Sequence, residues 1–576
     1  MMNMKKIWFK SVLLALVGFM ATSCGDFLEI YPLTMVYEDN YWNEKKDVDQ
    51  IVYGCYTRMQ DADYLKRVFM WGEVRSDNIG QETPDYVGYT WDECYVLRED
   101  ILSKNQYTSW TSFYDVINRC NLVIDRAPKV AEKDPNYMES DVRATIAEVT
   151  ALRALSYFYL VRTFKDVPYY NGVITTDDQR LNYPATDGNQ VIRYLLDDLN
   201  SVLSDALVIY PMVGGRDISY GRITRNAIYA LMADMCLWIG DFENAAIYSQ
   251  NVIDAKINMF KTEGYEYILQ MSNNYPILPD NSTTAMGKYA AYNEICGGQG
   301  GGLESIFELD FTNETNDGSK SNEMVAAFTY RTKVNDKEQA MGLFKPSETL
   351  YKGTDVFSDD KDSRIAESYF IDDPANPGEY YIHKFSMNSF GSVTINGVAS
   401  GTPRSTKNDG NWIFYRTSDV MLMKAEALIY LLDEEFDYND QDNINTKRAK
   451  EAFNLIKAIA DRSALNSTST LKASDYTNKS SLIQLLYAER RREFLFEGKR
   501  WFDLVRWARH EGTTERLAEF VSKKFTTGSS GNAVGNLRNN AMRMYWPYNY
   551  DEMKVNKNLI PNPAYPEITD SYESTN

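Results

Sequence analysis

The chain has 576 residues, 44% of them hydrophobic and 25% charged, so it is long enough to bury a large core. Its formal net charge of -20 repels DNA and RNA, which predicts that no nucleic acid is a partner. Only two histidines are present, and the Walker A, GxGxxG, HExxH and G-x-S-x-G patterns are absent, so we expect no catalytic residue, metal or cofactor.

The N-terminus has the organisation of a secretory signal with a lipoprotein cleavage site. Lysines precede an apolar run at 11–20, and small residues then lead to Cys24. The run is shorter than the roughly 20 residues that span a bilayer, which disfavours a membrane-anchoring helix. One departure is Ala21, where leucine is more usual. We interpret 1–23 as a signal peptide and expect Cys24 to begin the mature chain and to carry lipid.

Five cysteines remain when Cys24 is set aside, and none forms a CxxC pair. This count is not typical of a disulfide scaffold or of a zinc site. One disulfide bridge could still form among them, and the sequence leaves its pairing open. The five are Cys55, Cys94, Cys120, Cys236 and Cys296.

Helical spacing of apolar residues predicts the first elements of the chain. The predicted helices cover 47–59, a segment from 107 to about 124, 141–165 and 188–207. Between the first two, residues 75–106 are polar, aromatic and irregular. We expect a long loop there, and long loops in compact proteins are often functional.

Two segments resemble tetratricopeptide helix pairs, with small residues at helical spacing and a turn between two helices. They are 222–257, with its turn at Gly240-Asp241, and a looser copy at 417–462. The copies are too far apart in the sequence for a simple solenoid. The expected fold is mostly α, a single domain at 24–576 with a tetratricopeptide-like frame at about 24–257 and 417–576. A loop-rich insertion at about 258–416 carries a few short strands, including one at 304–311.

The segment 482–509 is dense in charges of alternating sign. Glu489, Glu493 and Glu497 could be interpreted as glycosidase carboxylates, which face each other across a cleft about 5 Å apart in retaining enzymes. Residues four apart share one helix surface instead, and the neighbouring arginines keep them ionised. These points favour an ion-pair network between helices.

The acidic stretch 433–442 raises the question of a calcium site. Counted from Asp437, the twelfth position is Arg448 and not the glutamate of an EF-hand, so a solvated acidic turn is favoured.

The charged segment 482–509 closely resembles the signature of the SusD/RagB family, the surface glycan-binding lipoproteins of Bacteroidetes. Further blocks agree in the family's order, so the resemblance covers essentially the whole chain. They are Asp26-Phe27-Leu28, residues 151–154 through 166–169, Arg222-Ile223-Thr224, 416–420 before 425–427, and 545–547 through 558–563.

The resemblance implies a non-catalytic lipoprotein, held on the outer membrane by the lipid on Cys24 and facing the cell exterior. It would bind an oligosaccharide and deliver it to a SusC-like TonB-dependent transporter. A minority of the family takes peptides, so a RagB-like peptide-binding protein stays open. A surface glycoside hydrolase is a third alternative, which the lack of a catalytic constellation disfavours.

A neutral sugar is bound by aromatic faces and by polar side chains that bond its hydroxyl groups. The segment 75–106 offers both, with Trp91 as the main platform. For every candidate the alternative is a structural place in or near the core. The other expected ligand-binding residues are Tyr89 and Tyr95 beside Trp91, Arg75, Asp77 and Asn78 as polar partners, and Tyr289 and Tyr292 as a second aromatic wall.

Overall fold

The structure is a computed structural model of the full chain. It describes residues 40–80, 90–174, 183–279, 290–297, 300–311, 321–328, 331–334, 337–340, 342–351, 356–357, 362–373, 376–382, 384–395, 398–403, 410–464, 469–525 and 531–565. Cys24, Tyr89 and Tyr289 lie outside the described residues. No described helix is both long and apolar enough to cross a membrane.

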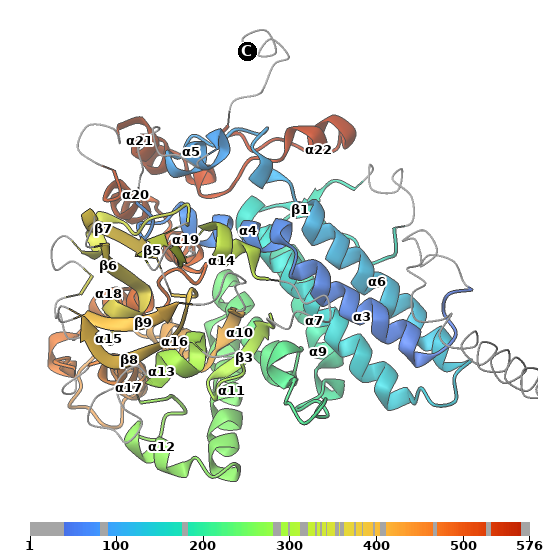
Figure 1. Ribbon diagram of the computed structural model, residues 1–576, viewed down its shortest axis with the longest axis horizontal. Coiled ribbons are helices and arrows are strands. Elements are labelled where there is room, and N and C mark those ends of the chain that lie inside the picture. Colours follow the sequence, from blue (N-terminus) through green and yellow to red (C-terminus); the bar gives the residue numbers. More distant parts are fainter. Residues whose placement is uncertain are drawn as a thin grey trace, which may run out of the picture.

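The N-terminal half is a layer of long helices (Figure 1). They form because apolar residues recur every three or four positions, so each helix has a face to bury. α7 is the central helix, and all of its side chains from Ala147 to Phe164 are buried. The sequence predicted all four helices, although α6 begins four residues later than expected and continues about seven residues further. They are α3 (Lys45–Met59), α6 (Thr111–Ala131), α7 (Glu139–Phe164) and α9 (Gly188–Val202).

The two tetratricopeptide-like pairs are present and lie side by side. The first is α10 (Arg225–Ile239) with α11 (Phe242–Thr262), joined at Gly240, whose φ of 81° suits glycine. The second is α16 (Thr417–Tyr430) with α17 (Ile444–Ser463). α11 packs directly on α16. The distance between the copies in the sequence is therefore no obstacle to stacking, because the intervening segment leaves the frame and returns to it.

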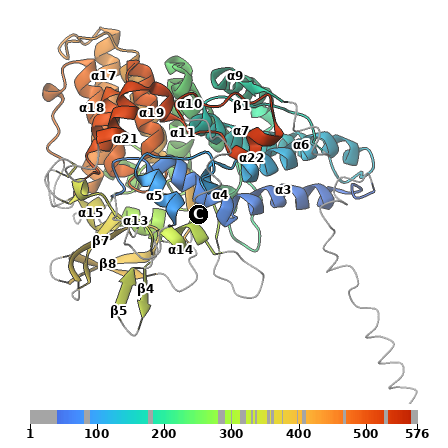
Figure 2. The same ribbon diagram turned by 90° about the horizontal axis from the view of Figure 1, so that it is seen from above.

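Two distant strands of the insertion between the pairs form one antiparallel ladder. β3 (Ser305–Leu309) pairs with β10 (Trp412–Arg416), and the register places Leu309 opposite Trp412. β3 confirms the strand predicted at 304–311. Three hairpins follow β3 in the chain, and Figure 2 shows them on the side of the molecule away from α17. They are β4 (Arg331–Val334) with β5 (Lys337–Ala340), β6 (Tyr369–Asp373) with β7 (Asn376–Ile382), and β8 (Met387–Ile395) with β9 (Val398–Pro403).

Short helices also occur in the described parts of the insertion, which are more regular than expected. They are α12 (Glu266–Met271), α13 (Ala290–Tyr292), the π-helix η5 (Asn293–Gly297), α14 (Glu323–Phe328), η6 (Glu348–Leu350) and α15 (Ser363–Ser368). One further two-stranded ladder lies outside the insertion, between β1 (Val167–Pro168) and β2 (Ala185–Thr186).

The charged segment 482–509 forms two helices and not one. α18 (Lys479–Glu493) ends before a sharp turn, and α19 (Arg500–Glu511) follows it. Phe496 and Gly498 have φ values of 63° and 71°, which are incompatible with a right-handed helix. The chain then continues through α20 (Glu515–Ser522), α21 (Gly531–Asn539), η8 (Ala541–Met544) and α22 (Tyr550–Val555).

Candidate functional site

The segment expected as a loop at 75–106 contains a short helix that presents Trp91. After α4 (Ala62–Phe69) and the π-helix η1 (Met70–Val74), the described chain resumes at Thr90 and forms α5 (Trp91–Leu97). Trp91 is 69% exposed. Tyr95, one helical turn later, is half-buried beside it, with ring centroids 6.3 Å apart and planes inclined by 35°. The two rings form a continuous aromatic surface, here called the α5 platform.

Polar contacts hold the start of α5 in place. Glu93 and Thr90 form a capping box, in which the Thr90 N–H donates to Glu93 Oε2 over 3.0 Å. The Tyr107 hydroxyl donates to the other oxygen of Glu93. Asn105 Nδ2 donates to the Asp92 carbonyl over 2.9 Å. Trp91 therefore extends into solvent from a helix whose other face is fixed to the protein.

Arg75 anchors the far end of this segment and is not a ligand contact. Its guanidinium group is 1% exposed, donates to Glu99 Oε2 over 2.7 Å, and lies 4.0 Å from the ring centre of Trp501. Lys524 Nζ reaches the other oxygen of Glu99 over 3.2 Å. The expectation that Arg75 bonds a sugar does not agree with this burial, because its donors are used inside the protein.

Asp77 and Asn78 are also interior residues, both 0% exposed. Asp77 pairs with Arg491 over 3.0 Å and with Arg500 over 2.8 Å. Burial alone would raise the pKa of Asp77, but the two guanidinium charges hold it well below its usual range. Asn78 Nδ2 donates to Glu73, and its oxygen accepts from Arg491. The expectation that Asp77 and Asn78 bind a sugar is therefore wrong. Both residues are buried and connect this segment to α18 and α19.

Tyr292 is corrected in the same way. It is 3% exposed, and its hydroxyl group donates to the Lys384 carbonyl. Its helix, α13, lies well away from α5 in Figure 1, so it cannot form a second wall of the α5 platform. Of the expected aromatic residues that the structure describes, only Trp91 and Tyr95 come together.

Some residues that contact α5 or the segment after it were not predicted from the sequence. Gln106 is exposed, and its backbone N–H donates to Asp92 beside Trp91 over 3.2 Å. The Tyr550 N–H donates to the Ser103 carbonyl over 2.9 Å, which brings α22 against the segment after α5. Lys104 Nζ lies 4.7 Å from the ring centre of Tyr550. Figure 1 shows α5, α21 and α22 along the same edge of the molecule.

The predicted ion-pair network at 482–509 is confirmed. Glu489, Glu493 and Glu497 are at most 2% exposed. Arg364 pairs with Glu489 over 2.7 Å, and Arg416 with Glu497 over 2.8 Å. Arg416 and Arg462 both pair with Glu493. Burial alone would raise the pKa of the three carboxyl groups, but the neighbouring cationic side chains lower it. The three glutamates are therefore ionised, connect helices through ion pairs, and are poor proton donors.

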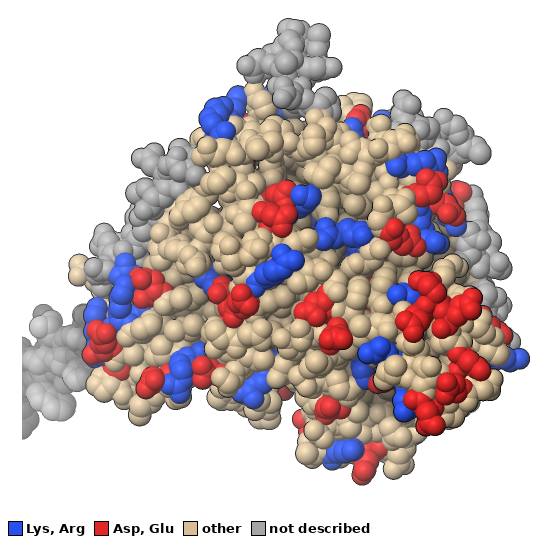
Figure 3. Space-filling view, turned by 180° about the vertical axis from the view of Figure 1, so that it is seen from behind, with Lys and Arg blue, Asp and Glu red and all other residues tan. Residues whose placement is uncertain are grey.

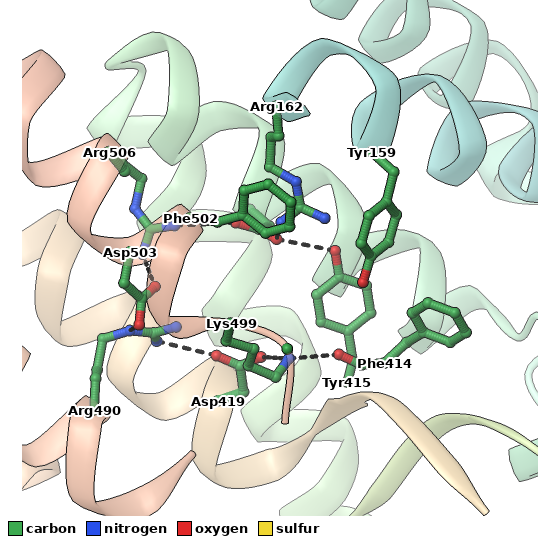
Figure 4. A pocket seen from close by; sticks show the side chains of 12 residues that line it. Tyr159, Arg162, Phe414, Tyr415, Asp419, Arg490, Lys499, Phe502, Asp503 and Arg506 are labelled. Atoms are coloured by element: carbon green, nitrogen blue, oxygen red, sulfur yellow. Dashed lines mark hydrogen bonds and ion pairs between the residues drawn. The ribbon is translucent and has the colours of Figure 1, made fainter. Parts of the chain in front are cut away.

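A small internal cavity lies at the centre of this frame (Figure 4). Its volume is about 20 Å³, room for about one water molecule and not for a sugar ring. The charged groups around the cavity form ion pairs with one another, for example Lys499 with Asp419 and Arg506 with Asp503. The lining residues are Tyr159, Arg162, Asp234, Phe414, Tyr415, Asp419, Arg490, Gly498, Lys499, Phe502, Asp503 and Arg506.

The face of the molecule seen from behind carries both signs of charge (Figure 3). On the face in Figure 3, acidic and basic side chains are interspersed. In the acidic stretch 433–442, Asp437 accepts from the backbone N–H of Asn439, and both residues belong to an exposed turn. Within the described part of the chain, no group of three or more His, Cys, Asp or Glu side chains is arranged to hold a metal ion.

Comparison with protein families matches both ends of the chain. A model described as "SusD family" matches residues 368–565, and one described as "Starch-binding associating with outer membrane" matches residues 26–237. SusD-like protein P38 of Formosa agariphila is 23% identical over 531 residues, which cover 88% of this chain and 92% of the relative. A SusD-like protein of Bacteroides ovatus is 21% identical over 540 residues, 88% of this chain and 84% of the relative.

Solved structures show the same helical scaffold. A laminarin-binding SusD-like protein has a TM-score of 0.61 and 21% identity, over 91% of this chain and 100% of its own. Surface glycan-binding protein A from Bacteroides uniformis has a TM-score of 0.61 and 19% identity, over 90% and 100%. At these identities the structures establish a shared fold. The fold is a helical-repeat scaffold. The two family models identify the family to which the chain belongs. The chain belongs to the SusD/RagB family.

Proposed function

We propose that the chain captures an oligosaccharide on the α5 platform at the cell surface and delivers it, without turnover, to a SusC-like TonB-dependent transporter. The observation that carries this proposal is the 69% exposure of Trp91 on a helix that is capped and anchored. A tryptophan left in solvent forgoes the free energy of burial, which a ligand recovers by covering the ring. Because α5 is held by these contacts, less conformational entropy is lost when a ligand binds to Trp91.

One exposed polar residue whose side chain could bond sugar hydroxyl groups is fixed to α5. Gln106 is exposed and its backbone is fixed to Asp92, next to Trp91. An amide side chain both donates and accepts hydrogen bonds, as a hydroxyl group requires. We therefore assign Gln106, in place of Asp77 and Asn78, as the polar group of the proposed site.

The proposed location follows from the N-terminal signal together with the family. Lipid on Cys24 would hold the chain on the outer membrane, and a nutrient-capturing protein has to face the cell exterior. The family model that matches residues 26–237 is described as associating with the outer membrane, which supports this placement. A Cys24→Ser variant should be lost from the membrane fraction of the producing cell.

Two other functions are less well supported. A glycoside hydrolase needs a carboxyl group that can donate a proton, and the most suggestive glutamates, Glu489, Glu493 and Glu497, are buried in ion pairs. A peptide-binding protein would use the same exposed rings. The names of two structural neighbours, a laminarin-binding protein and a surface glycan-binding protein, favour a glycan.

Calorimetric titration of the mature chain tests the proposal. Laminarin and starch oligosaccharides, acidic oligosaccharides and mixed peptides are titrated separately. Saturable binding of one glycan without product formation, lost in Trp91→Ala, is the expected result. Tyr267→Ala is the matched control, because Tyr267 is 47% exposed on α12, at the opposite end of the molecule from α5 (Figure 1). Peptide binding alone, or binding unchanged in Trp91→Ala, would contradict the proposal.

A further inference from the structure

Two cysteine sulfur atoms meet between α3 and α6. Cys55 belongs to α3 and Cys120 to α6, and both side chains are 0% exposed. The Cys120 thiol donates a weak hydrogen bond to Cys55 Sγ, and the two sulfur atoms are 3.8 Å apart. They are free thiols in the structure. The other described cysteines, Cys94, Cys236 and Cys296, lie on α5, α10 and η5.

The two cysteines lie where two helices pack against each other. α3 packs along α6. A disulfide has a bond of about 2.05 Å between its sulfur atoms. Because the two sulfur atoms are already in contact, we infer that rotation of the two side chains can close the remaining gap.

We propose that Cys55 and Cys120 are joined by a disulfide in the exported protein. The inference rests on the export that belongs to the proposed function, because disulfides persist outside the cytosol and are rare within it. The bond resolves the pairing that the odd set of five cysteines leaves open. It leaves Cys94, Cys236 and Cys296 as thiols.

The oxidant is a disulfide-bearing thiol oxidoreductase of the cell envelope. The thiolate of one cysteine attacks a sulfur atom of that disulfide and releases the oxidoreductase's other sulfur as a thiolate. The second cysteine then attacks the mixed disulfide, which forms the bond between Cys55 and Cys120. Two electrons and two protons pass to the oxidoreductase, which leaves as a dithiol. The exchange occurs while the chain folds, because burial afterwards raises the pKa of Cys120 far above its usual value and excludes the oxidant.

The crosslink closes the part of the chain that carries the ligand platform. The segment between Cys55 and Cys120 contains α4, η1 and α5. A bond at its base limits the conformations of this segment in the unfolded chain, which stabilises the fold. It also ties α3, the first described helix after the lipidated N-terminus, to α6, which packs on the central helix α7.

Mass spectrometry of the mature chain, produced by export into an oxidising compartment, tests the pairing. The chain is unfolded in denaturant and treated with iodoacetamide, with and without prior reduction. The expected result is three labels without reduction and five with it, and a disulfide-linked peptide containing Cys55 and Cys120. Five labels under both conditions, or a bond between other cysteines, would overturn the proposal. Glycan binding does not enter this readout, so failure here is distinct from failure of the proposed function.

Variants show what the bond does. Reductant should lower the melting temperature of the wild-type chain by several degrees and leave that of Cys55→Ala/Cys120→Ala unchanged. Cys236→Ala is the matched control, because Cys236 is equally buried and should respond to reductant as the wild type does. A double variant that still loses melting temperature on reduction would show that the bond is elsewhere.

Discussion

Arg75 and Glu99 form an ion pair in the interior, with 2.7 Å between Nη2 and Oε2 and 1% exposure of each side chain. Arg75 follows η1 directly, and Glu99 comes two residues after α5 ends. The pair therefore joins the two ends of the segment that carries the α5 platform. Arg75 also donates to the backbone carbonyl groups of Arg543 and Met544, and these bonds connect the segment to the C-terminal part of the chain.

Replacement of Arg75 should lower the free energy of unfolding and weaken ligand binding. Arg75→Met leaves Glu99 buried with one cation fewer, and breaking a buried pair costs about 3–5 kcal/mol of unfolding free energy. Urea denaturation measures the loss. Arg143→Met is the control, because Arg143 is 46% exposed in its pairs with Glu139 and Asp205, and such surface pairs contribute about 1 kcal/mol or less. Equal losses in both variants would contradict the anchoring role of Arg75.

Glu73 should make the protein less stable as the pH rises. It is buried and bonded to neutral donors, the Asn78 amide and the N–H groups of Phe496 and Gly498. Burial raises the pKa of Glu73 from 4.5 to about 7. Between those values the folded state holds a proton that the unfolded state has released. The contribution of Glu73 to the free energy of unfolding is therefore largest below pH 4.5. It falls by about 3 kcal/mol as the pH rises from 4.5 to 7 and does not change further above pH 7.

Glu73→Gln isolates that contribution, because the amide keeps the shape and does not titrate. Urea denaturation of both proteins from pH 5 to pH 8 should show the wild type losing stability relative to Glu73→Gln. Parallel profiles would contradict the assignment. Below pH 4.5 both proteins should lose stability, because the pKa of Glu493 is held well below its usual range by Arg462 and Arg416 despite its burial.

Gly72 should not tolerate a side chain. A Cβ atom there would overlap the carbonyl oxygen of Gly498, where η1 crosses the turn between α18 and α19. Gly72→Ala should cost at least about 2 kcal/mol of unfolding free energy, since neither backbone can move without breaking the contacts of Glu73. Gly535→Ala is the control. It lies in α21 with open space around it and should gain up to about 1 kcal/mol. A neutral Gly72→Ala would contradict the close approach.

Truncation of the α5 platform should affect affinity and not stability. Trp91→Ala should weaken glycan binding by about 2 kcal/mol, roughly thirty-fold in Kd, as for a central aromatic contact. Tyr95→Ala should lose less, because its ring is half-buried. Melting temperatures of both variants should stay near that of the wild type. A Trp91→Ala variant that loses stability in proportion to affinity would indicate a structural tryptophan.

The helical frame could be predicted because its signals are local. In α10 and α11, small residues recur at helical spacing and Gly240 marks the turn between the helices. The start of α5 also had a local signal, since Thr90 and Glu93 form the pattern of a capping box. The break between α18 and α19 had only the weak signal of Gly498. Much of its cause is Glu73, which accepts the N–H groups of the turn from more than 400 positions away.

The amino-acid sequence by itself determined the family, the helical class of the fold, and Trp91 as the residue on which the proposed site rests. The tertiary structure decided which polar residues near Trp91 are accessible. Asp77 and Gln106 both look suited to a sugar, but Asp77 meets Arg500, 423 positions away, and Gln106 stays in solvent. Periodicity reports the environment of a helix face, whereas burial of a charge depends on a partner that only the folded chain brings near.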